Sequence, residues 1–128
     1  MLRQNISSSG RFEKVIGYSR VVRVGNLIFV SGTTGTEAGG QATLAEESYL
    51  QTKRSIGNIE NALNKAGASL INVVRTRVFV SPKAEWHSVA RAHEEAFGTI
   101  LPASSMLVCN FLDPSILVEI EADAVAGE

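Results

Sequence analysis

The first regular pattern of apolar residues along this chain is that of β-structure. Residues 18–24 and 27–31 are rich in valine, isoleucine and phenylalanine, and Gly25-Asn26 lies between them. Such a pair between two apolar runs is typical of a tight hairpin turn. The pattern therefore predicts two antiparallel strands. Residues 1–17 are polar and interrupted by serine and glycine, so we expect an arm that lies against the body of the protein.

The next long segment, residues 43–66, has a helical period. Gly67 follows it and supplies the expected C-terminal cap. We predict one long amphipathic helix, preceded by a glycine-rich loop over residues 31–41. The apolar positions at helical spacing are Tyr49, Ile56, Ile59, Leu63 and Ala66.

Residues 71–80 are dense in β-branched side chains, which predicts a strand in a buried sheet position. Alternation along a strand assigns its side chains to two faces. One face would carry Arg75, Arg77 and Phe79, and the other would carry Val74, Thr76 and Val78.

A second helix is predicted after Ser81, which would be its N-cap with Pro82 at the first helical position. Leu101-Pro102 would end this helix. Its apolar stripe consists of Trp86, Val89, His93, Ala96, Phe97 and Ile100.

Two further β-rich segments, residues 104–111 and 116–125, flank a turn at residues 112–115. The resulting order, ββαβαββ, favours an α/β (α+β) domain with one mixed sheet and both helices on one face. No further helix is predicted that could cover the other face. We therefore expect other subunits to cover it in a closed, symmetric oligomer.

Composition narrows the class of protein. The 128 residues, 45% of them hydrophobic, suit one globular domain over residues 1–128, and a formal net charge of -1 offers no broad basic face for nucleic acid. The single Cys109 cannot form an internal disulfide, and no cysteine and histidine residues have the spacing of a metal site. The N-terminus lacks a signal peptide and no apolar run could cross a membrane, so we expect a soluble cytoplasmic protein.

Five segments resemble the Rid family of YjgF-type enamine and imine deaminases in order and spacing, over almost the whole chain. The first is YSRVVRVGNLIFVSG at residues 18–32, and the second is the helix carrying Gln51 and Asn58 before Ala-Gly-Ala. The others are VVRTRVFV at residues 73–80, PASS at residues 102–105 and VEIEA at residues 118–122.

The resemblance implies a chorismate-mutase-like fold, a homotrimer whose sheets line a central barrel, and ligand clefts between neighbouring subunits. It also implies a small-molecule substrate: similar proteins hydrolyse reactive enamines and imines, such as 2-aminoacrylate, to a 2-keto acid and ammonia. No cofactor or metal is implied. In this chemistry an arginine directly after Pro-Ala grips the substrate carboxylate, and a glutamate near the C-terminus positions water.

This chain keeps the glutamate of the family but not the arginine. Glu119 matches the water-positioning glutamate, Tyr18 and Gly32 match other cleft positions, and Ser104 stands at the arginine position. A bidentate arginine contact to a carboxylate contributes about 1.5–3 kcal/mol, against about 1 kcal/mol for a neutral hydrogen bond. Affinity for small 2-imino acids should therefore fall about tenfold or more. Met106 also replaces the cysteine usual in the family.

Each candidate residue has a structural interpretation beside the functional one. Glu119 could be a general base or an ordinary charge on an exposed strand, and Ser104 could bind a ligand or simply begin a strand. Arg77 and Arg20 could replace the missing positive charge, although surface ion pairs are the commoner role of such residues. Trp86 could wall the cleft or belong to the core.

The remaining candidates are weaker. The backbone from Ser104 through Ser105 to Met106 could bind the polar end of a substrate. His93 lies on an apolar stripe, where a histidine is usually a core or interface residue. Cys109 is more simply explained as a small buried apolar residue than as a reactive thiol. The glycine-rich loop lacks the ending of a phosphate-binding loop.

Three functions remain open on these residues. The leading hypothesis is a Rid-type hydrolase of small reactive enamines or imines, or of a related carbonyl compound, with selectivity shifted away from 2-imino acids. The second is a non-catalytic trimer that binds a metabolite or protects other proteins. The third is an endoribonuclease or translation inhibitor, which the absence of a basic patch disfavours.

Overall fold

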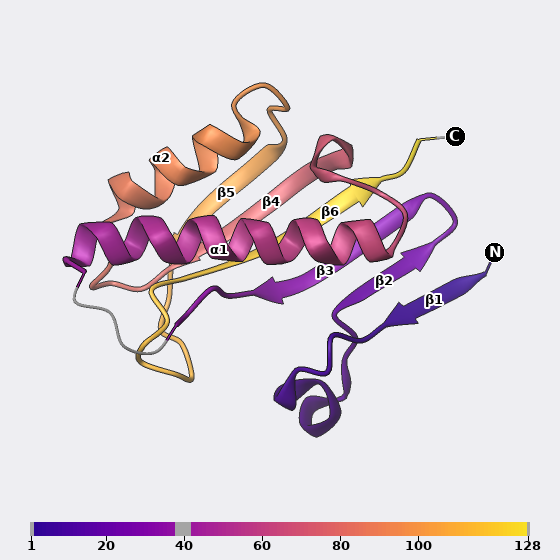
Figure 1. The fold of residues 1–128 in the computed structure, drawn as a ribbon, viewed down its shortest axis with the longest axis horizontal. Helices are drawn as coiled ribbons and strands as arrows, with labels where there is room; N and C mark the ends of the chain where they lie inside the picture. The colour runs from indigo at the N-terminus through magenta and orange to yellow at the C-terminus, as the bar shows by residue number, and fades with distance from the viewer. Residues whose placement is uncertain (1, 38–41, 128) are drawn as a thin grey trace.

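A computed structural model of the chain describes residues 2–37 and 42–127, and over these residues a mixed six-stranded sheet carries two long helices (Figure 1). The strands are β1 (Arg3–Ile6), β2 (Val21–Val24), β3 (Leu27–Thr33), β4 (Val73–Val80), β5 (Ala103–Val108) and β6 (Val118–Val125). The helices are α1 (Leu44–Lys65) and α2 (Trp86–Phe97), with short helical turns η1 (Glu13–Gly17) and η2 (Leu70–Asn72).

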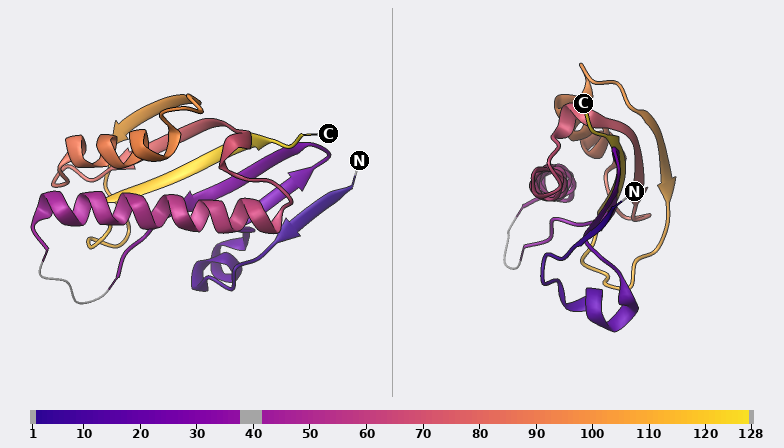
Figure 2. Two further views of the ribbon diagram at one scale, coloured as in Figure 1. Left: turned by 45° about the horizontal axis from the view of Figure 1, so that its top comes forward. Right: turned by 90° about the vertical axis from the view of Figure 1, so that its right-hand side faces the viewer.

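The sheet has the order β1-β2-β3-β6-β4-β5, in which β4 and β5 are parallel and all other neighbours are antiparallel. Both helices lie on one side of the curved sheet, as Figure 2 shows, and α1 packs against β3, β6 and α2. The predicted mixed sheet with both helices on one face is confirmed. The hairpin at Gly25-Asn26 and the long helix capped by Thr43 are confirmed as well.

The core lies between the helices and one face of the sheet, because buried and exposed side chains alternate along the strands. On β6, Val118, Ile120 and Ala122 are fully buried beneath the helices, while Glu119 and Glu121 lie on the opposite face and are only partly buried. The core also includes residues of β2, β3, β4 and both helices, among them Val21, Ile28, Val78, Val80, Ile59, Leu63, Val89 and Phe97. A single strand therefore supplies both core side chains and charged side chains.

The N-terminal arm contains more structure than its polar sequence predicts. Residues Arg3–Ile6 form β1, an edge strand paired with β2, and residues Glu13–Gly17 form a π-helical turn. The predicted five-strand order therefore lacks one strand. This strand was missed because its sequence, Arg-Gln-Asn-Ile, does not alternate apolar and polar residues; backbone pairing with β2 holds it instead.

The start of the second helix was predicted too early. Ser81 and Pro82 lie in a turn, and α2 begins at Trp86 with Glu85 as its N-cap, whose carboxylate accepts a hydrogen bond from Ser88 N at 2.7 Å. Ser81 is instead used by the sheet, since its N–H donates to Leu117 O. Trp86 is consequently 53% exposed rather than part of the apolar stripe.

The predicted faces of β4 hold except at one position. Thr76 and Val78 face the helices as expected, but Val74 is 48% exposed and Val73 is buried in its place. A register shift between Val73 and Arg75 opposite β6 accounts for the exchange, because a bulge reverses the alternation that precedes it.

The edge strand β5 is exposed along its whole length, including its apolar residues 106–108, with Val108 71% exposed. The open face of the sheet also exposes Leu27 and Phe29. In the described part of the chain no helix is long and apolar enough to span a membrane.

Candidate functional site

A cavity of about 710 Å³ opens beside the downstream end of β3 and the upstream end of β6 and is bounded by three segments far apart in sequence, residues 10–20, 31–34 and 111–119. The N-terminal arm forms one wall, residues 111–116 form another, and Glu119 of β6 contributes a carboxylate. The apolar lining consists of Phe12, Ile16, Phe111, Leu112, Pro114 and Ile116. The polar lining includes Arg11, Tyr18, Arg20, Gly32, Asp113 and Glu119.

Glu119 is a half-buried carboxyl group that lies directly against the backbone of Gly32. A β-carbon added to Gly32 would lie 2.6 Å from Glu119 Oε2 and 2.9 Å from its carboxyl carbon, so only glycine leaves room for this side chain. Burial, followed by the negative charge of Glu121, raises the pKa of Glu119, and Arg20 opposes the rise. A carboxyl group with a raised pKa can both accept and return a proton closer to neutral pH.

Arg20 is held rigidly at the edge of this cavity. Its Nη1 donates to Gly32 O and to Thr33 Oγ1, both at 2.8 Å, and its Nη2 donates to Tyr18 Oη at 3.4 Å. These contacts fall where the pairing of β3 with β6 is irregular, between Val30 and Thr33. Arg20 thus fixes the irregular backbone on which Glu119 rests.

The loop after β3 is bound to α1, which keeps the rim of the cavity in place. Ser55 Oγ donates to Thr33 O at 2.7 Å, and Asn58 Nδ2 donates to Thr34 O at 2.9 Å. Gly35 lies so close to α1 that an added β-carbon would collide with Arg54 Cβ. Arg54 also donates to the carbonyl of this glycine.

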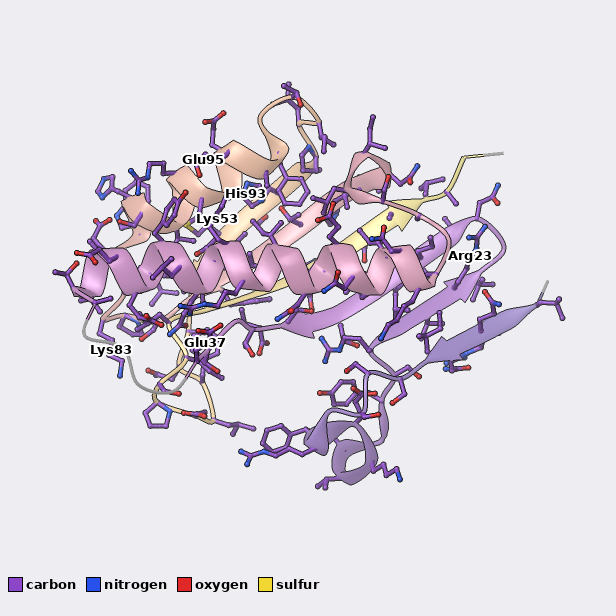
Figure 3. The ribbon with its side chains drawn as sticks, in the orientation of Figure 1. Arg23, Glu37, Lys53, Lys83, His93 and Glu95 are labelled. Carbon is purple, nitrogen blue, oxygen red and sulfur yellow. The ribbon has the colours of Figure 1, made fainter. Side chains whose placement is uncertain are left out.

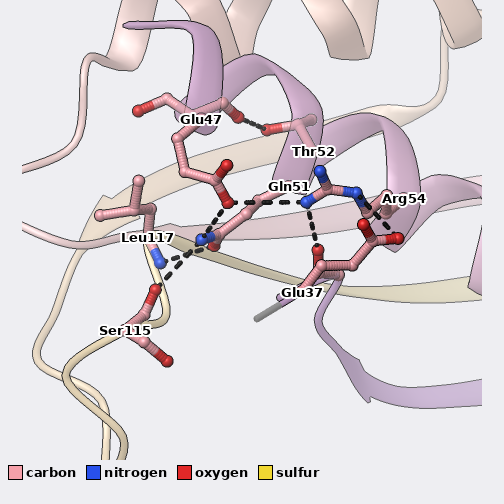
Figure 4. Close-up of polar contacts among 9 residues, drawn as sticks. Glu37, Glu47, Gln51, Thr52, Arg54, Ser115 and Leu117 are labelled. Carbon is pink, nitrogen blue, oxygen red and sulfur yellow. Dashed lines mark hydrogen bonds and ion pairs between the residues drawn. The ribbon is translucent and has the colours of Figure 1, made fainter. Parts of the chain in front are cut away.

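The loop before β6 is bound to the same helix through Gln51, as Figure 4 shows. Its Oε1 accepts from Leu117 N at 2.8 Å, and its Nε2 donates to Ser115 O at 3.1 Å. The Nε2 group also donates to Glu47 at 2.9 Å. From the other side, Lys83, labelled in Figure 3, donates to Pro114 O at 2.6 Å. The wall formed by residues 111–116 is therefore anchored at two points.

The wall formed by the N-terminal arm depends on the buried Glu13. Its carboxylate accepts hydrogen bonds from Ser7 Oγ (2.8 Å), Ser8 Oγ (2.6 Å) and Gly10 N (3.1 Å). The hydrogen bond from Ser8 is the largest cause that lowers the pKa of Glu13 to about 2. The arm is thereby folded back on itself at the point where Arg11 and Phe12 reach the cavity.

Four of the predicted site residues meet in this cavity: Tyr18, Arg20, Gly32 and Glu119. Arg11 and Phe12 line it as well, and the sequence interpretation missed both. No apolar period in the polar arm marks them, because the arm is folded by hydrogen bonds from Ser7, Ser8 and Gly10 to the carboxylate of Glu13.

Ser104 and Met106 lie elsewhere in the protomer. They pair in register with Thr76 and Val78, so they occupy the face of the sheet that carries the helices. There they line a second cavity of about 240 Å³ together with His93, which Figure 3 shows on α2. The Thr76 hydroxyl donates to Ser104 Oγ at 2.8 Å and lies 2.9 Å from His93 Nε2.

The other predicted site residues do not line the first cavity within the described protomer. Trp86 stacks on His87 at the surface, with ring centroids 3.8 Å apart. Arg77 forms ion pairs with Glu121 (3.4 Å) and Asp123 (3.2 Å) on the open face of the sheet, the face on which its β5 partner Ser105 also lies.

Burial, and to a lesser extent the charge of Glu119, raises the pKa of Cys109, which disfavours its reactive thiolate. Over residues 2–37 and 42–127 no three His, Cys, Asp or Glu residues form a group that could hold a metal ion.

Comparison with known proteins finds similarity over nearly the full chain. The endoribonuclease L-PSP family model matches residues 9–126. An uncharacterized protein of Streptomyces coelicolor is 32% identical, over 97% of this chain and 92% of that protein. The 2-iminobutanoate/2-iminopropanoate deaminase of Rattus norvegicus is 31% identical, over 99% of this chain and 93% of that protein. The crystal structure of a YjgF/YER057c/UK114 family member from Mycobacterium tuberculosis is 42% identical with a TM-score of 0.87, and the match covers 98% of this chain and 100% of that one.

Proposed function

This chain belongs to the Rid family, also called the YjgF/RutC or endoribonuclease L-PSP family, and from that premise we propose that it hydrolyses small reactive enamines or imines, or a related carbonyl compound. The observation that carries the proposal is the carboxyl group of Glu119, half-buried against Gly32 in a cavity that Tyr18 and Arg20 also line. Relatives of this chain include imine deaminases.

The proposed reaction uses Glu119 as both base and acid. The carboxylate takes a proton from water as the water oxygen bonds to the carbon of the C=N group, and the carboxyl group formed gives this proton to the imine nitrogen. Glu119 then transfers the hydroxyl proton of the resulting carbinolamine to its amino nitrogen as the C–N bond breaks, so that imine and water yield carbonyl compound and ammonia. The raised pKa of Glu119 supports this role, because the same group must release the proton that it accepts.

Selectivity is proposed to be shifted away from small 2-imino acids. The resemblance implies that Ser104 stands at the position of the arginine, and its hydroxyl accepts a hydrogen bond from Thr76. A serine hydroxyl offers about 1 kcal/mol where a bidentate arginine offers about 1.5–3 kcal/mol. Small imino acids held only by their carboxylate would therefore bind about tenfold more weakly or worse.

We further propose that the protein is a homotrimer in which a neighbouring subunit closes the cavity. The exposed apolar residues 106–108 of β5 and the exposed Leu27 and Phe29 of the open sheet face support association, since a monomer rarely leaves so much apolar surface uncovered. In such a trimer Ser105, on the open face of the sheet, and the exposed Trp86 would reach the cleft of the next subunit. Light scattering that reports a monomer would remove this part of the proposal.

Replacing Glu119 with glutamine tests the catalytic proposal. The amide side chain would keep the shape but not the proton affinity, so hydrolysis of 2-aminoacrylate generated in situ should fall by a factor of about 100 or more while the thermal unfolding curve stays in place. Glu60→Gln, an exposed carboxyl group on α1 and outside the cavity lining, is the control and should retain activity. Unchanged hydrolysis in Glu119→Gln would favour the second candidate, a non-catalytic binding or protein-protecting trimer.

The endoribonuclease candidate rests on the name of the matching family model. The near-neutral charge of the chain argues against it, because RNA binding draws mainly on clustered lysine and arginine. Cleavage of single-stranded RNA that disappears in Glu119→Gln would reinstate it.

A further inference from the structure

Among the charged groups of the cavity that Glu119 lines, Arg11 is the cation available to a ligand. Its guanidinium carbon lies over the Phe12 ring, 4.5 Å from the ring centre. Within residues 2–37 and 42–127 its side chain forms no hydrogen bond and no ion pair within 4 Å. Arg20, by contrast, donates to Gly32, Thr33 and Tyr18.

The acidic residue near Arg11, Asp113, forms no hydrogen bond or ion pair with it among the described residues. Asp113, which also lines the cavity, accepts hydrogen bonds from Ser115 N at 2.9 Å and from Ser115 Oγ at 2.7 Å. These contacts commit its carboxylate to the turn before β6. Arg11 acts on Asp113 only through its charge, and more weakly than Ser115 does.

The backbone around Arg11 is fixed on both sides, so its side chain is presented from a defined position. Gly10 N donates to the Glu13 carboxylate at 3.1 Å, and Glu13 N donates to Gly10 O at 3.1 Å. Residues 10–13 therefore form a closed turn around the buried carboxylate. A binding group on such a turn loses less conformational freedom on binding than one on a mobile arm.

We propose that Arg11 binds the anionic end of the substrate, and that the substrate is an imine or enamine that joins a carboxylate to a bulky apolar group. This deepens the proposed imine hydrolysis and rests on it. The cavity of about 710 Å³ falls in the range that accommodates ligands much larger than a three- or four-carbon imino acid. Its lining of Phe12, Ile16, Phe111 and Leu112 suits an aromatic or branched aliphatic body.

The arrangement relocates the positive charge rather than removing it. The arginine that similar proteins carry after Pro-Ala would come from β5, whereas Arg11 comes from the arm, next to the apolar side chains of the same wall. Two guanidinium groups and two carboxyl groups line the cavity, so it carries little net charge. Discrimination then depends on which end of the substrate meets Arg11 and which end meets Glu119.

The test measures binding of phenylpyruvate and of phenylacetone, which lacks the carboxylate, by calorimetry on the intact protein. In Arg11→Ala, phenylpyruvate should bind about tenfold more weakly while phenylacetone changes less than about twofold. Arg11→Lys should recover part of the affinity. Arg3→Ala removes an exposed arginine of the same arm, on β1 and outside the cavity, and should change neither affinity.

Three results would overturn the proposal. They are unchanged phenylpyruvate affinity in Arg11→Ala, an equal loss for both ligands, and no measurable binding of phenylpyruvate to the unaltered protein. An equal loss would mean that the substitution deforms the apolar wall rather than removing an anion contact.

Kinetics separate this inference from the proposed function. With the imine of phenylpyruvate generated in situ, Arg11→Ala should raise KM about tenfold and leave kcat nearly unchanged, because Glu119 is untouched. Hydrolysis with an unaltered KM would overturn the inference and leave the imine hydrolase standing. Arg11-dependent binding without hydrolysis of any imine would overturn the hydrolase and leave an anion-binding cavity.

Discussion

Replacing Gly32 with alanine should remove activity without unfolding the protein. The new β-carbon would lie 2.6 Å from Glu119 Oε2 and 2.9 Å from its carboxyl carbon, both at the end of a flexible side chain. The easiest relief is rotation of Glu119 out of its position over the strand. A displacement of about 1 Å at a reacting group can cost about 100-fold in rate, and we expect a loss of that size in kcat/KM.

The same substitution should leave stability nearly unchanged. The backbone of Gly32 does not have a positive φ, so alanine fits its conformation. Alanine is favoured over glycine within a strand by about 0.5–1 kcal/mol, which offsets the cost of moving one partly exposed carboxylate. Thermal unfolding and imine hydrolysis should be measured on the same samples.

Gly57→Ala on α1 is the matched control for Gly32→Ala. An added β-carbon there meets no atom within 4 Å, so we expect about 1 kcal/mol of added stability and full activity. Gly32→Ala should also add no further loss in the Glu119→Gln background, since both changes act on one carboxylate. Full activity in Gly32→Ala, or an additive loss in the double variant, would refute the position assigned to Glu119.

The remaining predictions concern the two walls of the cavity. Gln51→Ala leaves the Leu117 N–H without its partner and should lower the free energy of unfolding by about 1–3 kcal/mol in urea denaturation, whereas Gln4→Ala on the exposed β1 should change it by less than about 0.5 kcal/mol. Glu13 has a lowered pKa in the folded protein, so its stabilising contribution is fully present above about pH 4.5 and is lost as the pH falls toward 2. The difference in Tm between the unaltered protein and Glu13→Gln should therefore shrink over that interval, and a constant difference would contradict the assigned hydrogen bonds.

The elements that the sequence predicted are those whose side chains repeat with a clear period. Helix α1 and the strand β6 could be predicted because their apolar residues recur at a fixed spacing, and this spacing identifies the face that is buried. Strand β1 has no such spacing of apolar residues, since it is held by hydrogen bonds between its backbone and that of β2. The start of α2 was misplaced because Ser81-Pro82 is a good helix-start signal locally, but it begins only one turn, in which Ala84 N donates to Ser81 O, and α2 then starts at Trp86.

The candidate site was predictable only in part for a related reason. Tyr18, Gly32 and Glu119 lie within segments that resemble known proteins, and the structure brings them together. Arg11 and Phe12 lie in a polar arm, and their place depends on Glu13 accepting hydrogen bonds from Ser7, Ser8 and Gly10. Hydrogen bonds from neighbouring residues to a buried carboxylate leave no periodic pattern of apolar residues in the sequence. Pairing of Ser104 with Thr76 likewise decided its face, and that register is not encoded locally.

The separation of the cavity from the core explains how selectivity could change while the fold stays the same. The helix-facing residues of β6 are constrained by packing, whereas the opposite face and the arm meet solvent or another subunit. The turn that carries Arg11 is held by four hydrogen bonds to the carboxylate of Glu13 and not by packing in the core. Substitutions at residues 11 and 12, which take no part in the hydrogen bonds to Glu13, can therefore move a positive charge within the cavity at little cost to the sheet, which is a freedom that an arginine on β5 does not have.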